Sequence, residues 1–127
     1  MKRIRMILGP LALAVGLAAC SGGSGGSSPA VASPGSGPQI VAKDMKFQQT
    51  KVELPANKVD SVAFVNQDGA PHNVAIFTDS SASKSLFVGD VISNSTATYQ
   101  IPALAPGTYF FRCDNHPDTM TGTLVAK

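Results

Sequence analysis

The feature that most limits the fold is the spacing of turn residues along the chain after Gln39. Short apolar and β-branched runs alternate there with Gly, Pro, Asn and Asp about every 8 to 12 positions. Runs of this length are typical of strands, and outside the N-terminal segment no window of about 11 residues has a 3.6-residue apolar period. The sequence therefore predicts an all-β protein.

We expect about eight strands, packed as a single sandwich with Greek-key connections. The expected strands are 40–47, 51–54, 61–66, 73–77, 86–88, 97–100, 107–113 and 121–126. The expected core consists of Val62, Phe64, Val74, Ile76, Tyr99, Ile101, Tyr109, Phe111 and Leu124. A domain at 39–127 is small enough to have one core and no separate substrate domain.

Residues 1–19 have the pattern of an export signal. Three basic residues precede an apolar run at 7–19 that is short for a membrane span and ends in small residues. The sequence Leu17-Ala18-Ala19-Cys20 resembles the bacterial lipobox, which implies cleavage before Cys20 and acylation of that residue. An ordinary signal peptide is the alternative. We expect an exported lipoprotein, anchored in a cell membrane and facing the periplasm or the cell exterior.

Residues 20–38 are predicted to be a tether between the lipidated cysteine and the domain. Between 21 and 38, every position except Ala30, Val31 and Ala32 is Gly, Ser or Pro. Such a segment has little apolar surface to bury, so we expect a disordered linker with a reach of roughly 20 to 25 Å.

The charge of the chain changes when the signal is removed. The whole chain carries +2, but residues 39–127 contain seven basic and eight acidic residues, a net charge of −1. The basic residues are few and scattered, which argues against a nucleic-acid partner.

The cysteine count raises the question of what Cys113 does. The chain has two cysteines, and exported proteins usually pair theirs. If Cys20 is lipidated, Cys113 is left as a free thiol, and metal ligation would explain it. A buried inert thiol and a Cys20–Cys113 disulfide are the alternatives.

One short segment gathers side chains that copper prefers. Residues 109–123 contain Cys113, His116 and Met120, and the other histidine of the chain, His72, lies 41 residues before the cysteine. A thiolate, two imidazoles and a weak axial thioether describe a blue-copper site. Zinc fits less well, because methionine is a poor zinc ligand. The pattern predicts one copper ion.

On these residues the chain resembles the cupredoxins of the plastocyanin and amicyanin type, over residues 39–127. The resemblance is strongest at 71–73 and 113–122, and the aromatic strand before Cys113 also matches. It implies that His72, Cys113 and His116 are the strong copper ligands and that Met120 is the axial one. It also implies that Asn73 ties the two ligand loops together.

The chain departs from that family pattern in two places. Three residues separate His116 from Met120, where plastocyanins usually have four and amicyanins two, so the length of the copper–methionine bond is open. Asn115 stands where many members of the family have proline, and so it keeps a backbone N–H. A hydrogen bond from that N–H to the Cys113 sulfur would raise the reduction potential; the alternative is an N–H that faces water.

The predicted function is electron transfer by a monomer, without chemistry on a substrate. Four protein ligands leave no open position on the metal, unlike a catalytic site. The resemblance implies electron passage through the exposed edge of His116, with Pro71 and Pro117 in an apolar patch for redox protein partners. A copper chaperone or copper-buffering protein outside the cytoplasm is the alternative.

Overall fold

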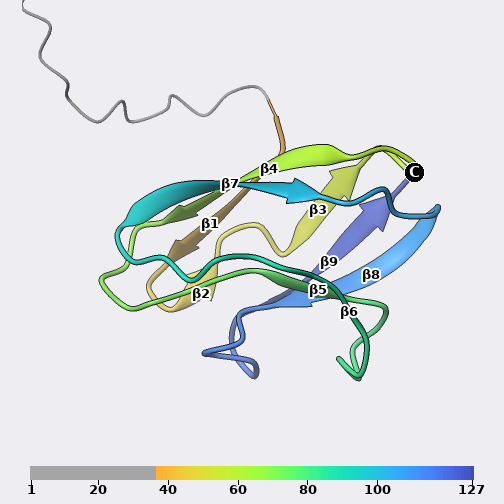
Figure 1. The fold of residues 1–127 in the computed structure, drawn as a ribbon. Helices are drawn as coiled ribbons and strands as arrows, with labels where there is room; N and C mark the ends of the chain where they lie inside the picture. The colour runs from red at the N-terminus through yellow and green to blue at the C-terminus, as the bar shows by residue number, and fades with distance from the viewer. Residues whose placement is uncertain (1–36) are drawn as a thin grey trace, which may run out of the picture. The chain divides into compact units, whose positions relative to one another are not determined.

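The computed structural model describes residues 37–127, whose strands form two stacked sheets (Figure 1). The strands are β1 (Gln39–Lys43), β2 (Lys46–Phe47), β3 (Lys51–Leu54), β4 (Asp60–Asn66), β5 (Ala75–Phe77), β6 (Ser85–Val88), β7 (Ser95–Ile101), β8 (Gly107–Arg112) and β9 (Thr121–Ala126). This part of the chain has no helix, and so none that could cross a membrane. The expected signal peptide, Cys20 and most of the expected tether lie outside the described residues.

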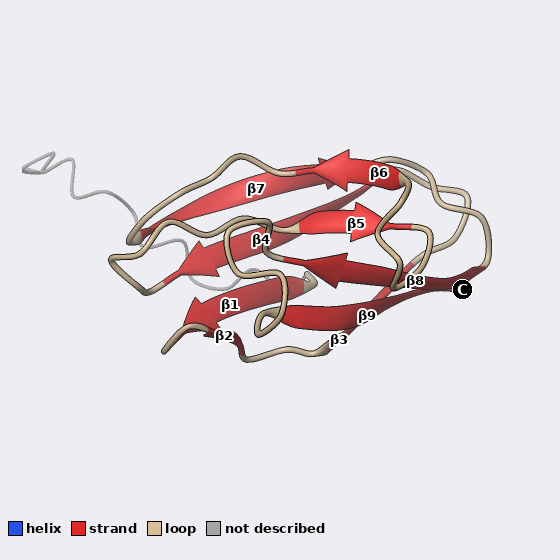
Figure 2. Cartoon of the chain, turned by 90° about the horizontal axis from the view of Figure 1, so that it is seen from below, coloured by secondary structure: helices blue, strands red, loops and turns tan. Residues whose placement is uncertain are grey.

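The two sheets differ in size and in strand order. One sheet has the order β2-β1-β4-β7 and the other β3-β9-β8-β5-β6 (Figure 2). Two pairs, β1 with β4 and β3 with β9, are parallel, and the others are antiparallel. The prediction of an all-β sandwich is confirmed.

The structure has nine strands where about eight were expected, because the stretch 40–47, expected as one strand, contains a hairpin. Asp44 and Met45 have φ angles of 54° and 59°, and Lys43 pairs with Lys46 on either side of them. Two consecutive left-handed residues are what a tight two-residue hairpin turn requires. Neither residue is glycine, so the apolar pattern gave no sign of the break. The other strands lie near their expected positions.

The core lies between the sheets, and strand alternation decides which side chains enter it. In β4, for example, Val62, Phe64 and Asn66 are buried while their neighbours are more exposed. Aromatic rings fill the centre: Phe64 stacks on Tyr99 with ring centroids 5.5 Å apart, and Phe47 packs on Phe111 at 5.4 Å.

The predicted core is buried, except that one of its residues is only partly so. The buried members are Val62, Phe64, Val74, Ile76, Tyr99, Ile101, Phe111 and Leu124. Tyr109 packs against the cluster from a partly exposed position. Its hydroxyl donates to the Ala105 carbonyl at 2.7 Å, which accounts for its place at the edge.

A close contact between β8 and β9 fixes the hairpin that carries the predicted metal ligands. Phe111 pairs with Gly122, and a Cβ atom at Gly122 would lie 2.2 Å from the Phe111 ring. The fully buried ring therefore occupies the space that any side chain at this position would need. Glycine allows this ring to sit directly over the neighbouring strand.

Candidate metal centre

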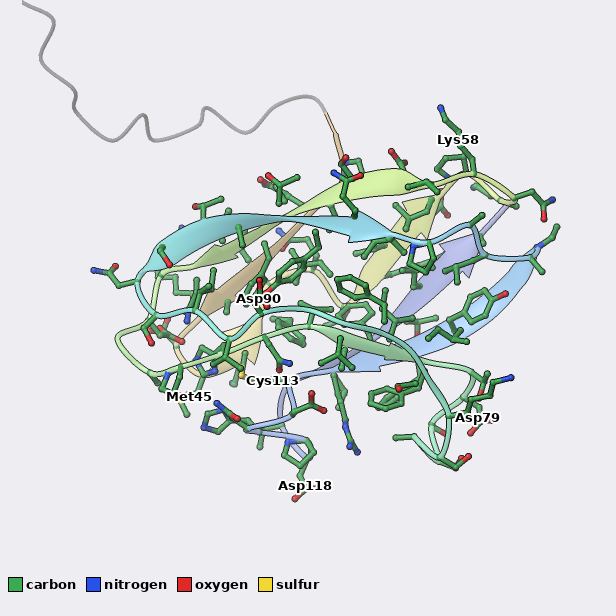
Figure 3. All side chains as sticks on the ribbon, viewed as in Figure 1. Met45, Lys58, Asp79, Asp90, Cys113 and Asp118 are labelled. Carbon is green, nitrogen blue, oxygen red and sulfur yellow. The ribbon has the colours of Figure 1, made fainter. Side chains whose placement is uncertain are left out.

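Strand register brings two distant segments together at one end of the sandwich. In the antiparallel pair of β5 and β8, Ala75 lies opposite Arg112. The residues just before Ala75 therefore face those just after Arg112, which places His72 beside the turn that starts at Cys113. Figure 3 places Cys113 and Met45 toward one end of the domain and Asp79 and Lys58 toward the other.

The segment from Cys113 to Met120 is a compact loop closed by its own backbone. The Cys113 N–H donates to the Met120 carbonyl at 2.9 Å, which joins the two ends of the loop. The His116 N–H donates to the Cys113 carbonyl at 3.2 Å, and the Met120 N–H donates to the His116 carbonyl at 3.0 Å. These turns fold the chain back on itself, so short sequence spacing becomes short distance in space.

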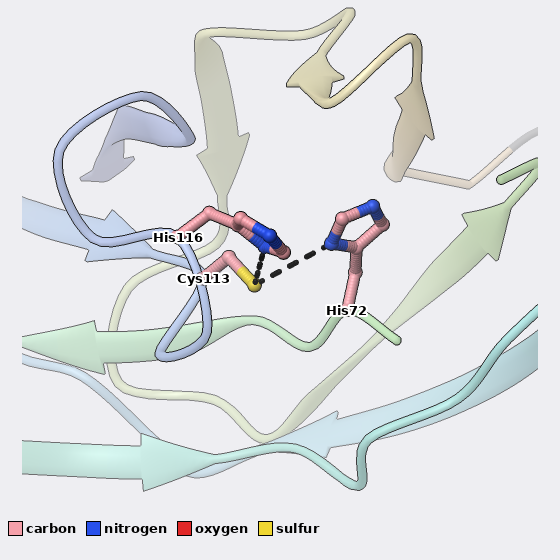
Figure 4. A group of neighbouring side chains, drawn as sticks. All are labelled: His72, Cys113 and His116. Atoms are coloured by element: carbon pink, nitrogen blue, oxygen red, sulfur yellow. Dashed lines mark hydrogen bonds between the residues drawn. The ribbon is translucent and has the colours of Figure 1, made fainter. Parts of the chain in front are cut away.

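Three of the four predicted ligands present their donor atoms to one another. The Cys113 Sγ lies 3.8 Å from Nδ1 of His72 and 3.9 Å from Nδ1 of His116 (Figure 4). The ligand atoms of the three residues all lie within 4.8 Å of one another. Both imidazoles thus face the sulfur with the same nitrogen, which is an arrangement that one ion can bridge.

Burial separates His116 from the other predicted ligands. The side chains of His72, Cys113 and Met120 are fully buried, with relative exposures of 0%. His116 is partly exposed and its ring meets that of His72 edge to face, with centroids 4.8 Å apart. His116 is therefore the predicted ligand through which the cluster reaches the surface.

The side chain of Asn73 joins the two segments. Its Oδ1 accepts from the Asp114 N–H at 2.9 Å, and its Nδ2 donates to the Asp114 carboxylate at 3.0 Å. Nδ2 also donates to the Gly89 carbonyl at 3.2 Å. With 1% exposure, Asn73 is a buried amide whose polar atoms are satisfied by Asp114, next to Cys113, and by the Gly89 carbonyl.

Asn115 makes a second link that sequence reasoning did not find. Its Nδ2 donates to the Pro71 carbonyl at 2.9 Å and so spans the same two segments on their outer side. The signal in the sequence was the asparagine itself, because the proline that many members of the family have at this position has no side-chain amide. The hydrogen bond from the Asn115 backbone to the Cys113 sulfur stays a prediction.

Asp68 is the other residue that sequence reasoning missed. Its Oδ2 lies 3.1 Å from Nε2 of His72, the ring nitrogen that faces away from Cys113. The hydrogen bond that the Met45 N–H donates is the main reason why the pKa of Asp68 lies below its usual value, and bonds from Asp44 and His72 add to it. An acidic residue four positions before a candidate ligand was the available signal.

The donor set fits copper on its own chemistry. Cys113 is a free thiol within residues 37–127, it is fully buried, and it faces two imidazole nitrogens. Soft sulfur with imidazole suits copper, whereas an inert core thiol would be packed among apolar groups. Met120, which lies in the same closed loop, offers a thioether, a second soft sulfur of the kind that suits copper.

Comparison with known proteins gives the family. A family model described as a cupredoxin-like domain matches residues 11–126. The chain belongs to the cupredoxin family. This cupredoxin is 31% identical to amicyanin-alpha of Methylorubrum extorquens over 94 residues, which covers 74% of the chain and 75% of that protein.

Solved structures agree with this assignment. The amicyanin of Paracoccus versutus matches with a TM-score of 0.58 and 26% identity, over 74% of this cupredoxin and 84% of that chain. Auracyanin A of Chloroflexus aurantiacus, described as a "blue" copper protein, matches with a TM-score of 0.61 and 20% identity, over 72% and 100%. The second likeness bears on the fold alone, and the predicted family is confirmed by the family model and the amicyanin relative of Methylorubrum extorquens.

Proposed function

We propose that this cupredoxin carries electrons on one copper ion held by His72, Cys113, His116 and Met120. The observation that carries the proposal is the convergence of one ligand atom from each of His72, Cys113 and His116 within 4.8 Å, with His72 and Cys113 fully buried. Copper bound in such a set supplies one-electron transfer by alternating between Cu(II) and Cu(I). Cys113 and the two histidines would be the strong ligands, and the thioether of Met120 would be the weak one.

The contacts around the ligands suit a carrier, because fast electron transfer requires a site that moves little between oxidation states. Asn73 and Asn115 join the ligand segments by three hydrogen bonds between 2.9 and 3.0 Å. The backbone of the Cys113–Met120 loop adds its own closing bonds. Both segments therefore keep their relative position whether or not the charge of the ion changes.

The burial of the two sulfur-containing side chains disfavours copper delivery, the alternative function. A protein that hands copper to another must exchange its sulfur ligands with the recipient. Cys113 and Met120 both have relative exposures of 0%, so no recipient ligand reaches either sulfur without the loop opening.

Electron exchange is proposed to occur at the surface around His116. Its ring is partly exposed, while Pro71 is exposed and Pro117 partly so. Met45, at the same end of the domain, is 41% exposed. A small apolar surface of this kind suits a weak and transient contact between a monomeric carrier and a redox protein partner.

The N-terminal segment is proposed to place the domain at a membrane. Residues 1–19 would direct export, Cys20 would carry the lipid, and residues 20–38 would separate the lipid from β1. A tether of that composition would leave the surface around His116 free to meet partners in the periplasm or at the cell exterior.

Voltammetry of the full-length protein loaded with one equivalent of copper tests the proposed carrier function. We expect a reversible one-electron wave, and a shifted wave with copper retained in Met120→Leu and Met120→Gln, since an axial thioether tunes the potential without holding the ion. Met45→Leu is the matched control and should leave the potential unchanged. An irreversible wave, together with rapid loss of Cu(I) to a competing chelator, would instead support the chaperone.

A further inference from the structure

The carboxylate of Asp68 lies within hydrogen-bond distance of three nitrogen atoms, and one of these nitrogens is Nε2 of His72. Its Oδ1 accepts from the Asp44 N–H at 2.9 Å, and its Oδ2 accepts from the Met45 N–H at 3.0 Å. The same Oδ2 lies 3.1 Å from Nε2 of His72. The His72 side chain has 0% exposure and that of Asp68 has 16%, so Asp68 is the polar partner of an imidazole without solvent contact.

Neighbouring groups fix the position of this carboxylate independently of His72. The Asp68 N–H donates to Oδ1 of Asn66 at 2.9 Å, and its carbonyl accepts from the Asn94 N–H at 2.8 Å. Asn66 is itself buried, with 2% exposure. The carboxylate also closes the turn between β1 and β2, where Asp44 and Met45 have positive φ. These contacts therefore fix the position of Asp68 without any contribution from His72 or from a bound metal.

This fixed acceptor decides which nitrogen of His72 is free. A neutral imidazole carries one proton, and the group facing one nitrogen determines whether that nitrogen donates. A carboxylate only accepts, so in a neutral ring this contact favours the tautomer with its proton on Nε2. The lone pair is left on Nδ1, which is the nitrogen 3.8 Å from the Cys113 sulfur.

We propose that Asp68 is a positioning residue that keeps His72 in the Nε2–H form with Nδ1 available to the metal, and that it lowers the reduction potential of the site. A carboxylate that accepts from a metal-bound imidazole makes the imidazole a stronger donor. A stronger donor stabilises Cu(II) more than Cu(I). The effect on the potential rests on the proposed copper function, whereas the state of the His72 ring does not.

Potentials of two isosteric variants of the copper-loaded full-length protein test the electronic effect. Partners of metal-bound histidines contribute about 10- to 100-fold to metal affinity. If Asp68→Asn lowers the affinity for Cu(II) tenfold and leaves the affinity for Cu(I) unchanged, the reduction potential should rise by about 59 mV, which corresponds to a tenfold change for a one-electron couple. Asp44→Asn is the matched control, because it removes an exposed carboxylate from the same turn while the hydrogen bond to His72 remains, and it should not change the potential.

The state of the His72 ring is tested by nitrogen–proton NMR of the copper-free wild-type protein. We expect the couplings of an Nε2–H imidazole for His72. A proton on Nδ1 would overturn the proposal, as would an equal potential in Asp68→Asn and wild type or an equal rise in Asp44→Asn. A protein that shows the Nε2–H form but no redox-active copper would reject the carrier function and keep the positioning role.

Discussion

Replacing Gly122 by alanine should destabilise the domain by about 2 kcal/mol, the size of effect expected when a packed core is overfilled. The added Cβ would lie 2.2 Å from the Phe111 ring, well inside the 3.4 Å at which ordinary contact begins. The ring cannot move aside easily, because Phe111 is fully buried and packs on Phe47 at 5.4 Å.

Two opposing terms set that magnitude. Forcing extra volume into a packed core costs about 1 to 3 kcal/mol, and the size of this overlap favours the upper end. Alanine also restricts the unfolded chain, which returns about 0.4 to 1 kcal/mol where the backbone suits it. Gly122 has no positive φ angle, so this gain applies. The difference between the two terms is a net loss of about 2 kcal/mol.

Urea unfolding of the copper-free full-length protein measures the effect, with Gly107→Ala as the matched control. Gly107 lies in the same strand pair, opposite Ala126, and a Cβ there would meet nothing closer than 3.8 Å. We expect Gly107→Ala to be neutral or slightly stabilising. The packing argument is refuted if Gly122→Ala loses less than about 0.5 kcal/mol, or if both variants lose the same amount.

Three further predictions concern the residues around the site and the anchor. Asn73→Ala should lower the free energy of unfolding by about 2 to 4 kcal/mol, because three hydrogen bonds of a buried amide are lost; a loss below about 1 kcal/mol in urea unfolding would contradict this. Asn115→Pro should lower the reduction potential while Asn115→Ala, which keeps the backbone N–H, should not; equal potentials in voltammetry would exclude a role for that N–H. Cys20→Ala should move the protein from the membrane fraction to the soluble fraction with an unchanged copper spectrum, and a lost spectrum would point to a structural role for Cys20.

Most of the fold could be predicted because each strand is a local pattern with a clear break at both ends. Runs such as 51–54 and 121–126 coincide with β3 and β9. The hairpin at Asp44 and Met45 could not, because its left-handed residues depend on the distant Asp68 carboxylate that accepts both of their N–H groups. A turn stabilised from elsewhere in the fold leaves little trace in its own sequence.

The candidate site also has a part that the sequence predicts and a part that depends on contacts between distant segments. Cys113, His116 and Met120 lie within one short loop, so their types and spacing suffice to predict a cluster. His72 could be proposed as a ligand because it is the other histidine of the chain, but its approach to Cys113 depends on the register of β5 and β8, which the sequence does not give. The contacts of Asp68 and of the Asn115 side chain appear only once that register places their partners.

The visible spectrum of the full-length protein after addition of one equivalent of Cu(II), beside that of Cys113→Ser, tests the copper site most directly. The buried thiolate between two imidazoles should give an intense blue or green charge-transfer band in the wild type. Cys113→Ser should lack that band, because the serine oxygen cannot donate in the same way. A colourless wild-type protein, or a variant that keeps the band, would contradict the assignment of Cys113 as the copper ligand.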